Sequence, residues 1–370
     1  MLRSEPTARS KLLRAFLVLV AALALTATNA GAATSPYKQP GMWVWYVSQT
    51  EGGDPVKIAT RAARYKVKTV FIKSGDGPNY WSQFDSIVGP LKQLGLRVCA
   101  WQFVYGSKPQ AEADVAARAV QAGADCFVID AEGQYENKYT AASQYITRLR
   151  GRIGLDYPVA LTSFAYPDFH PSVPYSVFLG PGGAQWNMPQ MYFKAFGSPI
   201  PKVFAHTWQY NQIYGRPISP LGQTYEGVRA KQVIEFRKYA RFYRSRGYSW
   251  WEWHFTRKDA WKALRRKLRP SRARAAAPAY PVYKQGAKGD IIRFAKMKLN
   301  ASGATLELNN TFDAVMTTAL QNFQSSKGLT VTGQLDAATW PVLLAVQIPV
   351  PDIPRIVRVG AAGPTAAVTR

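Results

Sequence analysis

The sequence predicts an α/β protein in which a (β/α)8 barrel of the TIM type precedes a small three-helix module. Between residues 38 and 268, short β-rich runs alternate with amphipathic helical patterns about eight times, the order expected of parallel strands joined by helical crossovers. A basic, Pro- and Ala-rich stretch at 269–279 then breaks the alternation, as a linker would. Three more helical patterns follow at 280–346, before a Pro-rich tail at 347–370 that we expect to be disordered.

The composition excludes a mostly disordered chain and indicates an anionic partner. Of the 370 residues, 47% are apolar and 13% aromatic, enough to offset the entropy lost when the chain becomes ordered. The 47 Lys and Arg against 22 Asp and Glu give a net charge of +25. Sixteen of the basic and three of the acidic residues lie between Arg229 and Arg274. Solvated helix faces are the plain interpretation of this excess, and the functional one is an anionic partner: nucleic acid, a membrane surface or a wall polymer.

The first 32 residues have the pattern of a secretory signal peptide. Basic residues up to Arg14 precede an apolar run from Ala15 to Leu25, and small residues follow at 30–33. The run is too short to cross a bilayer, which takes about 20 residues. We therefore expect a secreted, extracellular and wall-associated monomer, with no stable membrane insertion after cleavage and no nucleic-acid partner. An uncleaved N-terminal anchor is the alternative.

The alternating region fits a barrel better than an open, doubly wound sheet. Eight strands in about 230 residues match the usual size of such a barrel, and no Gly-x-Gly-x-x-Gly turn follows the first strand. The strands are expected at Met42–Val47, Thr69–Lys73, Arg97–Val104, Cys126–Asp130, Val159–Phe164, Asn187–Phe193, Ile218–Gln223 and Tyr248–Phe255. Helices are expected at Pro55–Tyr65, Gln83–Leu94, Ala111–Ala122, Ala141–Arg152 and Val228–Arg246.

The two cysteines, Cys99 and Cys126, lie in two of these apolar strands. Two cysteines exclude a disulfide framework and a zinc ribbon. We expect both to be buried free thiols that behave as small hydrophobic side chains. A disulfide between neighbouring strands is the alternative, and it requires a short Cα separation. The three histidines are scattered, so we expect no metal and no cofactor.

Polar residues gather at the C-terminal ends of the predicted strands, where a barrel of this type carries its function. Asp130 and Glu132 end the fourth strand at positions i and i+2, so they face one side and raise each other's proton affinity. Such a pair can hold one acid protonated and one ionised, as glycoside hydrolysis requires. We expect Glu132, Asp130 and Asp76 to be catalytic. The candidates for substrate binding are Lys73, Gln190, Tyr192, Gln223, Glu226, Glu252, Trp45 and Trp101.

Plainer interpretations exist for these residues. Asp130 and Glu132 could only anchor a loop or pair with Lys73, whose simplest role is that of a counter-ion to the acids. Ten of the eleven tryptophans lie between Trp43 and Trp261. Any one of them could simply fill the core. Taken together they favour a carbohydrate ligand, because aromatic faces pack against the apolar faces of sugar rings.

The segment 280–346 contains, along its whole length, a set of glycine, aliphatic, aromatic and polar residues whose order and spacing are informative. Its helices are expected from Asp290, as N-cap, to Leu299, at Asp313–Lys327 and at Asp336–Leu344. The set comprises Gly286, Gly289, Phe312, Ala319, Leu320, Phe323, Gln324, Gly328, Leu329, Gly333, Thr339, Trp340 and Leu343. The segment thereby resembles the three-helix peptidoglycan-binding-like domain of bacterial wall enzymes, which implies that peptidoglycan or another anionic wall polymer is the partner. We expect the two aromatic residues, Phe323 and Trp340, to be core rather than contact residues.

The barrel shares short motifs with a family of wall hydrolases. Asp130-Ala131-Glu132 resembles the strand-four Asp-x-Glu of the family 25 lysozyme-type muramidases, and Trp208-Gln209-Tyr210 is similar to their Trp-Gln-Tyr. The resemblance implies a secreted glycosidase that acts on wall glycan, with Glu132 as general acid and Asp130 as its electrostatic or substrate-assisting partner.

The chain departs from that family at the first strand. It has Gly41-Met42-Trp43 where the family has Gly-Ile-Asp. Asp76, Glu226 or Glu252 could replace the missing carboxylate, or the site could bind glycan without cutting it. The sequence therefore predicts a wall-glycan hydrolase. The alternative is a non-catalytic peptidoglycan- or carbohydrate-binding protein with a degenerate barrel.

Overall fold

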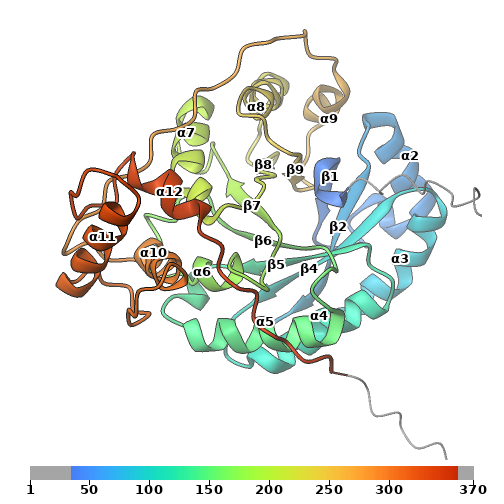
Figure 1. The fold of residues 1–370 in the computed structure, drawn as a ribbon. Helices are drawn as coiled ribbons and strands as arrows, with labels where there is room; N and C mark the ends of the chain where they lie inside the picture. The colour runs from blue at the N-terminus through green and yellow to red at the C-terminus, as the bar shows by residue number, and fades with distance from the viewer. Residues whose placement is uncertain (1–34, 357–370) are drawn as a thin grey trace, which may run out of the picture. The chain divides into compact units, whose positions relative to one another are not determined.

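A computed structural model of the protein describes residues 35–356. The predicted signal peptide and the last part of the predicted tail lie outside the described residues. Within 35–356, nine strands form one sheet in the order β1-β9-β8-β7-β6-β5-β4-β2-β3, and β1 also pairs with β2 (Figure 1). This extra pairing closes eight parallel strands into a barrel, which confirms the predicted fold class. The ninth strand, β3, is a short antiparallel addition to β2.

The strands agree with their predicted positions, and the differences lie at their ends. β4 and β6 have the predicted bounds, whereas β8 begins three residues late and the first and last strands end early. The strands are β1 (Pro40–Val44), β2 (Thr69–Asp76), β3 (Asn79–Tyr80), β4 (Arg97–Val104), β5 (Cys126–Ala131), β6 (Val159–Phe164), β7 (Trp186–Met191), β8 (Leu221–Gln223) and β9 (Tyr248–Trp251).

Helices surround the barrel, as strand–helix alternation requires (Figure 1). Three of them, α6, α7 and α9, were not among the helices predicted from the sequence. The helices of the barrel region are α2 (Pro55–Tyr65), α3 (Gln83–Gln93), α4 (Pro109–Gln121), α5 (Tyr139–Ile153), α6 (Tyr175–Phe178), α7 (Ile200–Asn211), α8 (Ala230–Phe242) and α9 (Lys258–Arg265). Asp54 begins α2 by accepting hydrogen bonds from the backbone N–H groups of Val56 and Lys57.

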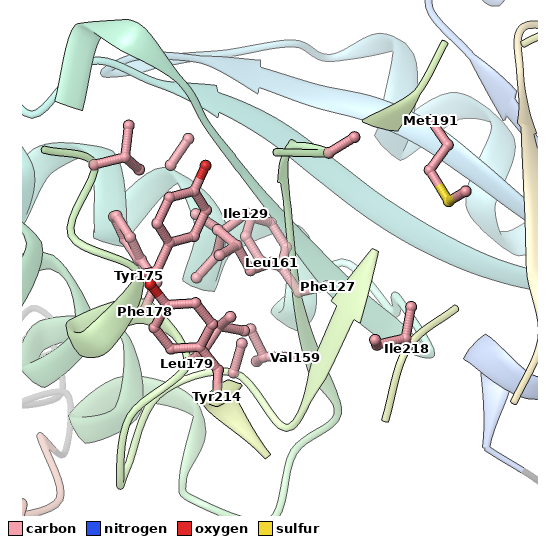
Figure 2. Close-up of a cluster of buried hydrophobic side chains, with 14 of the residues drawn as sticks. Phe127, Ile129, Val159, Leu161, Tyr175, Phe178, Leu179, Met191, Tyr214 and Ile218 are labelled. Atoms are coloured by element: carbon pink, nitrogen blue, oxygen red, sulfur yellow. The ribbon is translucent and has the colours of Figure 1, made fainter. Parts of the chain in front are cut away.

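Alternate residues of most barrel strands belong to two separate cores. In β5, Phe127 and Ile129 pack outward among the helices, and Figure 2 shows them in the cluster that contains Tyr175 and Phe178 of α6. Cys126 and Val128 face the inside of the barrel with Trp43, Phe71, Trp101, Met188 and Leu221. Because strand side chains alternate with a period of two, Asp130 follows Val128 on the inward face. The strand thus carries this carboxyl to the mouth of the barrel.

The cysteines form a disulfide, so the expectation of free thiols is wrong. Cys99 on β4 and Cys126 on β5 lie directly opposite each other in the parallel register, with 4.6 Å between their Cα atoms. Both residues are fully buried inside the barrel. The bridge joins the strand that carries Trp101 to the strand that carries Asp130.

The C-terminal module contains the three helices that the sequence predicts: α10 (Asp290–Ala301), α11 (Ala314–Ser326) and α12 (Thr339–Ala345). Asp313 caps α11 by accepting from the backbone N–H of Met316. Phe323 and Trp340 are buried in the core of the module, as expected. Asp290 is not the N-cap of α10: Gly289 holds that position, and Asp290 is the first helical residue, with its carboxylate directed to the barrel.

Candidate active site

A cavity of about 870 Å³ opens at the C-terminal ends of the barrel strands. Eight of the eleven predicted site residues line it: Asp76, Asp130, Glu132, Lys73, Gln190, Tyr192, Trp45 and Trp101. They come from β1, β2, β4, β5 and β7, or from the residues just after these strands. These side chains lie close together because the parallel strands of a barrel direct their C-terminal residues to one edge.

Two carboxyl groups and one amide form the centre of the cavity. The Gln190 side-chain amide donates to Asp130 Oδ1 at 3.0 Å and to Glu132 Oε1 at 2.8 Å. Burial, and then the neighbouring charge of Glu132, raise the pKa of the Asp130 carboxyl well above its ordinary value. Asp130 is 6% exposed, whereas Glu132 is partly exposed at the cavity surface. The site thus places a carboxyl whose surroundings favour its protonated form beside a carboxyl that a ligand can reach.

A second polar group, Lys73 with Asp76, lies on β2. The Lys73 ammonium is 2.5 Å from Asp76 Oδ2, and the Tyr105 hydroxyl donates to Asp76 Oδ1 at 2.7 Å. Both oxygens of Asp76 therefore have partners. The bond to Asp76 also raises the pKa of the Tyr105 hydroxyl to about 12. Lys73 pairs with Asp76, and its charge lowers the pKa of Asp130 only as a smaller effect against burial.

Three tryptophans surround the buried ammonium of Lys73. Its nitrogen lies 5.0, 4.4 and 5.1 Å from the ring centres of Trp45, Trp81 and Trp101, within the range of cation–π attraction. Trp101 is buried beneath the cavity, whereas Trp45 is 37% exposed at its rim. The rim therefore presents an aromatic face to a ligand next to a fixed positive charge.

The opposite wall is the chain that follows β6. Phe164, Ala165, Tyr166, Phe169 and His170 line the cavity there. The ring of His170 stacks on Phe164 with 3.4 Å between ring centres and 8° between planes. Tyr166 and Phe169 contact each other edge to face, and Phe169 is 66% exposed. This wall is aromatic, like the rim at Trp45.

Three predicted residues lie outside the cavity lining. Gln223 accepts hydrogen bonds from the backbone N–H groups of Lys194 and Ala195, and it donates to Glu226 at 2.9 Å. Glu252 is buried and accepts from the backbone N–H of Phe255. These side chains stabilise the loops after β7, β8 and β9.

Neither the Trp-Gln-Tyr segment nor Trp43, where the chain departs from the muramidase pattern, contributes an acid to the cavity. The Trp-Gln-Tyr segment lies on α7, where Trp208 packs against Phe204 and Tyr243. Trp43, at the position of the family's first-strand Asp, is fully buried, and its indole N–H donates to the Ser249 hydroxyl at 3.0 Å. No carboxylate therefore enters the cavity from β1 among the described residues.

Sequence reasoning missed several residues of the cavity. Tyr105 directly follows β4, so the strand-end rule that selected Asp76 would also have selected it. The residues 164–170 and Phe196 lie in or beside long loops with no local signal. In the part of the chain that the structure describes, His, Cys, Asp and Glu form no group of three or more that could hold a metal ion. No helix within 35–356 is both long and apolar enough to span a bilayer.

Comparison with known proteins identifies the C-terminal module. Residues 288–343 match the family described as "Putative peptidoglycan binding domain", which confirms the resemblance inferred from the sequence. No protein with a curated description matches the chain. A solved peptidoglycan-binding protein from Clostridioides difficile, in complex with glutamine hydroxamate, is 27% identical with a TM-score of 0.17. That match covers 17% of this chain and 40% of the other, so the chain spans less than half of that relative's length.

The barrel is similar to barrels of glycosidases and wall-lytic enzymes. A spore cortex-lytic enzyme from Bacillus cereus is 11% identical with a TM-score of 0.46, over 61% of this chain and 73% of that one. A chitinase from Chromobacterium violaceum is 10% identical with a TM-score of 0.45, over 61% of this chain and 98% of that one.

Proposed function

We propose that the protein is a secreted glycoside hydrolase that cleaves peptidoglycan or a related wall glycan through Asp130 and Glu132. The observation that carries the proposal is the pair of adjacent carboxyl groups, bridged by Gln190, in an aromatic cavity at the mouth of the barrel. The match of residues 288–343 to a peptidoglycan-binding family supports a wall glycan as the substrate.

In this proposal Glu132 is the proton donor because it is the member of the pair that faces the cavity. It protonates the glycosidic oxygen, the bond between that oxygen and the sugar C1 breaks, and a water molecule adds to C1 while its proton returns to the pair. Asp130, held beneath Glu132 by Gln190, keeps the second carboxyl close to the positive charge that develops on the sugar. Trp45 and the wall at Phe169 pack against sugar rings on either side.

The basic region that follows Arg229 supports retention on an anionic wall polymer. A groove of about 910 Å³ lies between α8 and the segment 266–273. Its cations are Lys231, Lys238, Arg241, Arg266, Lys267 and Arg269. Within the described residues, none of these six forms an ion pair, so their charges are available to a polyanion.

Two observations favour a second candidate function, glycan binding without cleavage. β1 contributes Trp43 in place of a carboxylate, and both oxygens of Asp76 are bonded to Lys73 and Tyr105. The Asp130–Glu132 pair would then have no third acid to assist it. A lectin-like barrel would bind wall glycan and release no product.

The release of reducing ends from purified peptidoglycan separates the two functions. We expect the parent protein to release them, and Glu132→Gln to lose at least about 100-fold of that activity. Glu307→Gln is the matched control, since it removes an exposed carboxylate on the module and should leave the rate unchanged. If the parent protein pellets with wall sacculi but releases no reducing ends, the binding function is correct. An active Glu132→Gln variant would refute the assignment of the proton donor.

A further inference from the structure

The module is joined to the barrel by a carboxylate that is buried between them. Asp290, the first residue of α10, is 1% exposed. It accepts hydrogen bonds from the Ser176 backbone N–H at 2.7 Å, the Ser176 hydroxyl at 2.6 Å and the Tyr214 hydroxyl at 2.9 Å. These donors all belong to the barrel region. A buried carboxylate that lost them would be very costly, so the bonds fix the position of Asp290 closely.

Backbone contacts extend this interface between the module and the barrel, which we call the seam. The Asp290 N–H donates to the Pro171 carbonyl at 2.7 Å. Gly289 has a positive φ of 133° and lies so close to Pro171 that an added Cβ would be 3.0 Å from the proline Cβ. Asn310 of the module donates to the Tyr139 hydroxyl of α5 at 2.7 Å. The module therefore approaches the barrel at several points around one short segment.

That segment continues into the wall of the candidate active site. Most residues of 164–170 line the cavity; Pro171, which the Asp290 N–H contacts, comes immediately afterwards, and Ser176 follows at the start of α6. His170 is one residue from Pro171, and its carbonyl accepts from the Val173 N–H at 3.2 Å. Within the wall, His170 stacks on Phe164. A displacement of Pro171 would therefore move the His170–Phe164 pair.

We propose that Asp290 is a positioning residue, and that the peptidoglycan-binding module holds the wall 164–170 of the cavity in place in addition to binding wall polymer. The module would then affect cleavage of a short soluble glycan that never contacts the module. Only this catalytic consequence rests on the proposed function. The effect on the order of the wall follows from the contacts themselves.

Hydrogen exchange of the full-length protein tests the positioning directly. We expect Asp290→Ala to speed amide exchange in residues 164–176 by about 10-fold or more, because the side-chain bonds to Ser176 and Tyr214 are lost and only the backbone bond to Pro171 remains. Asp290→Asn should restore slow exchange, since an amide oxygen can accept from the Ser176 N–H and the two hydroxyls can reorient. Tyr214→Phe removes one hydroxyl donor and should give an intermediate rate, and it keeps the test valid if Asp290→Ala does not fold.

Asp313→Ala is the matched control. Asp313 also begins a helix of the module, but its carboxylate bonds to Met316 and Lys296 within the module. This variant should loosen α11 and leave exchange in residues 164–176 unchanged. Equal acceleration by Asp313→Ala, or unchanged exchange in both Asp290→Ala and Tyr214→Phe, would overturn the proposal.

Kinetics on a soluble, uncross-linked glycan oligomer give the second measurement. We expect Asp290→Ala to raise KM about 10-fold with a smaller change in kcat, and Asp290→Asn to recover the parental KM. An unchanged KM in a variant with fast exchange would refute the link from wall to substrate. If the parent protein does not cleave glycan, the proposed function fails, and the exchange measurement still decides the role of Asp290.

Discussion

The mouth of the barrel and its seam with the module each contain a buried aspartate, and the two are used in different ways. Burial raises the pKa of both carboxyls: that of Asp130 well above its ordinary value, and that of Asp290 to about 6. Asp130 lies next to a second acid in an open cavity, whereas Asp290 is surrounded by hydrogen-bond donors of the barrel region. A buried aspartate thus belongs to an acid pair in one place and to a contact between module and barrel in the other, and its neighbours decide which.

Substituting asparagine for each of the two aspartates should show the difference between their roles most clearly. Asp130→Asn keeps the side-chain shape but cannot share a proton with Glu132. We expect it to lower kcat/KM for wall glycan by about 100- to 10,000-fold, the usual contribution of acid–base catalysis. Asp290→Asn should change kcat/KM by less than about 2-fold. Reducing-end assays on both variants give the comparison, and similar losses in the two would contradict it.

The disulfide gives the next largest effect, and it lies in the interior of the barrel, outside the seam. Cys99 and Cys126 join β4 and β5 across 27 residues of sequence. Replacing both with Ala should lower the free energy of unfolding by about 3 kcal/mol, the usual effect of opening a loop of this size. Denaturant unfolding with and without reductant measures it. Exchange in residues 164–176 should stay slow in this variant under native conditions, since the Asp290 contacts remain.

The pH dependence of stability tests the burial of the Asp290 carboxyl by a third route. The folded pKa of Asp290, about 6, exceeds its unfolded value of about 3.9, so the folded state holds this proton more tightly. Its contribution to stability is therefore full below pH 4 and is lost as the pH rises to 6. The loss amounts to about 3 kcal/mol, because each pKa unit is worth about 1.4 kcal/mol.

Asp290→Asn has no proton to lose. The free energy of unfolding of this variant, relative to that of the parent, should therefore rise between pH 4 and 6. Chemical denaturation of the two proteins at pH 4, 5, 6 and 7 measures the difference. If the parent protein instead becomes more stable relative to Asp290→Asn as the pH rises, the folded state favours the ionised form of the Asp290 carboxyl. The hydrogen bonds from Ser176 and Tyr214 would then outweigh its burial.

The sequence was informative where one structural rule acts at many positions. The ends of parallel strands converge, so Asp76, Asp130 and Gln190 could be placed in one site without knowledge of any contact. Gln223 also ends a strand but turns to the backbone of Lys194, a choice that depends on the path of another loop. The rule gives the position of a side chain along the strand and does not give its partner.

Features that depend on register or on docking could not be predicted. The disulfide requires that Cys99 and Cys126 lie opposite each other, and hydrophobic pattern alone leaves the offset of two parallel strands open. Asp290 looks like a local N-cap in the sequence, because its partners Ser176 and Tyr214 lie 114 and 76 residues away. Apart from Phe164, which ends β6, the wall at 164–170 is a loop without periodicity, so it carries no local signal.

The hydroxyl of Tyr105 gives the smallest expected effect, and it tests whether Asp76 belongs to the chemistry or to the scaffold of the mouth. Tyr105 donates to one oxygen of Asp76 while Lys73 holds the other. Tyr105→Phe removes one charge-assisted hydrogen bond, so the free energy of unfolding should fall by about 1 to 2 kcal/mol.

If Asp76 only anchors Lys73, kcat should change by less than about 3-fold, since the Lys73 contact remains. If Asp76 is catalytic, its freed oxygen changes its proton affinity, and the pH profile of kcat should shift. Denaturant unfolding together with a pH–rate profile separates these outcomes. A shifted profile with unchanged stability would show that Asp76 takes part in the reaction together with Asp130 and Glu132.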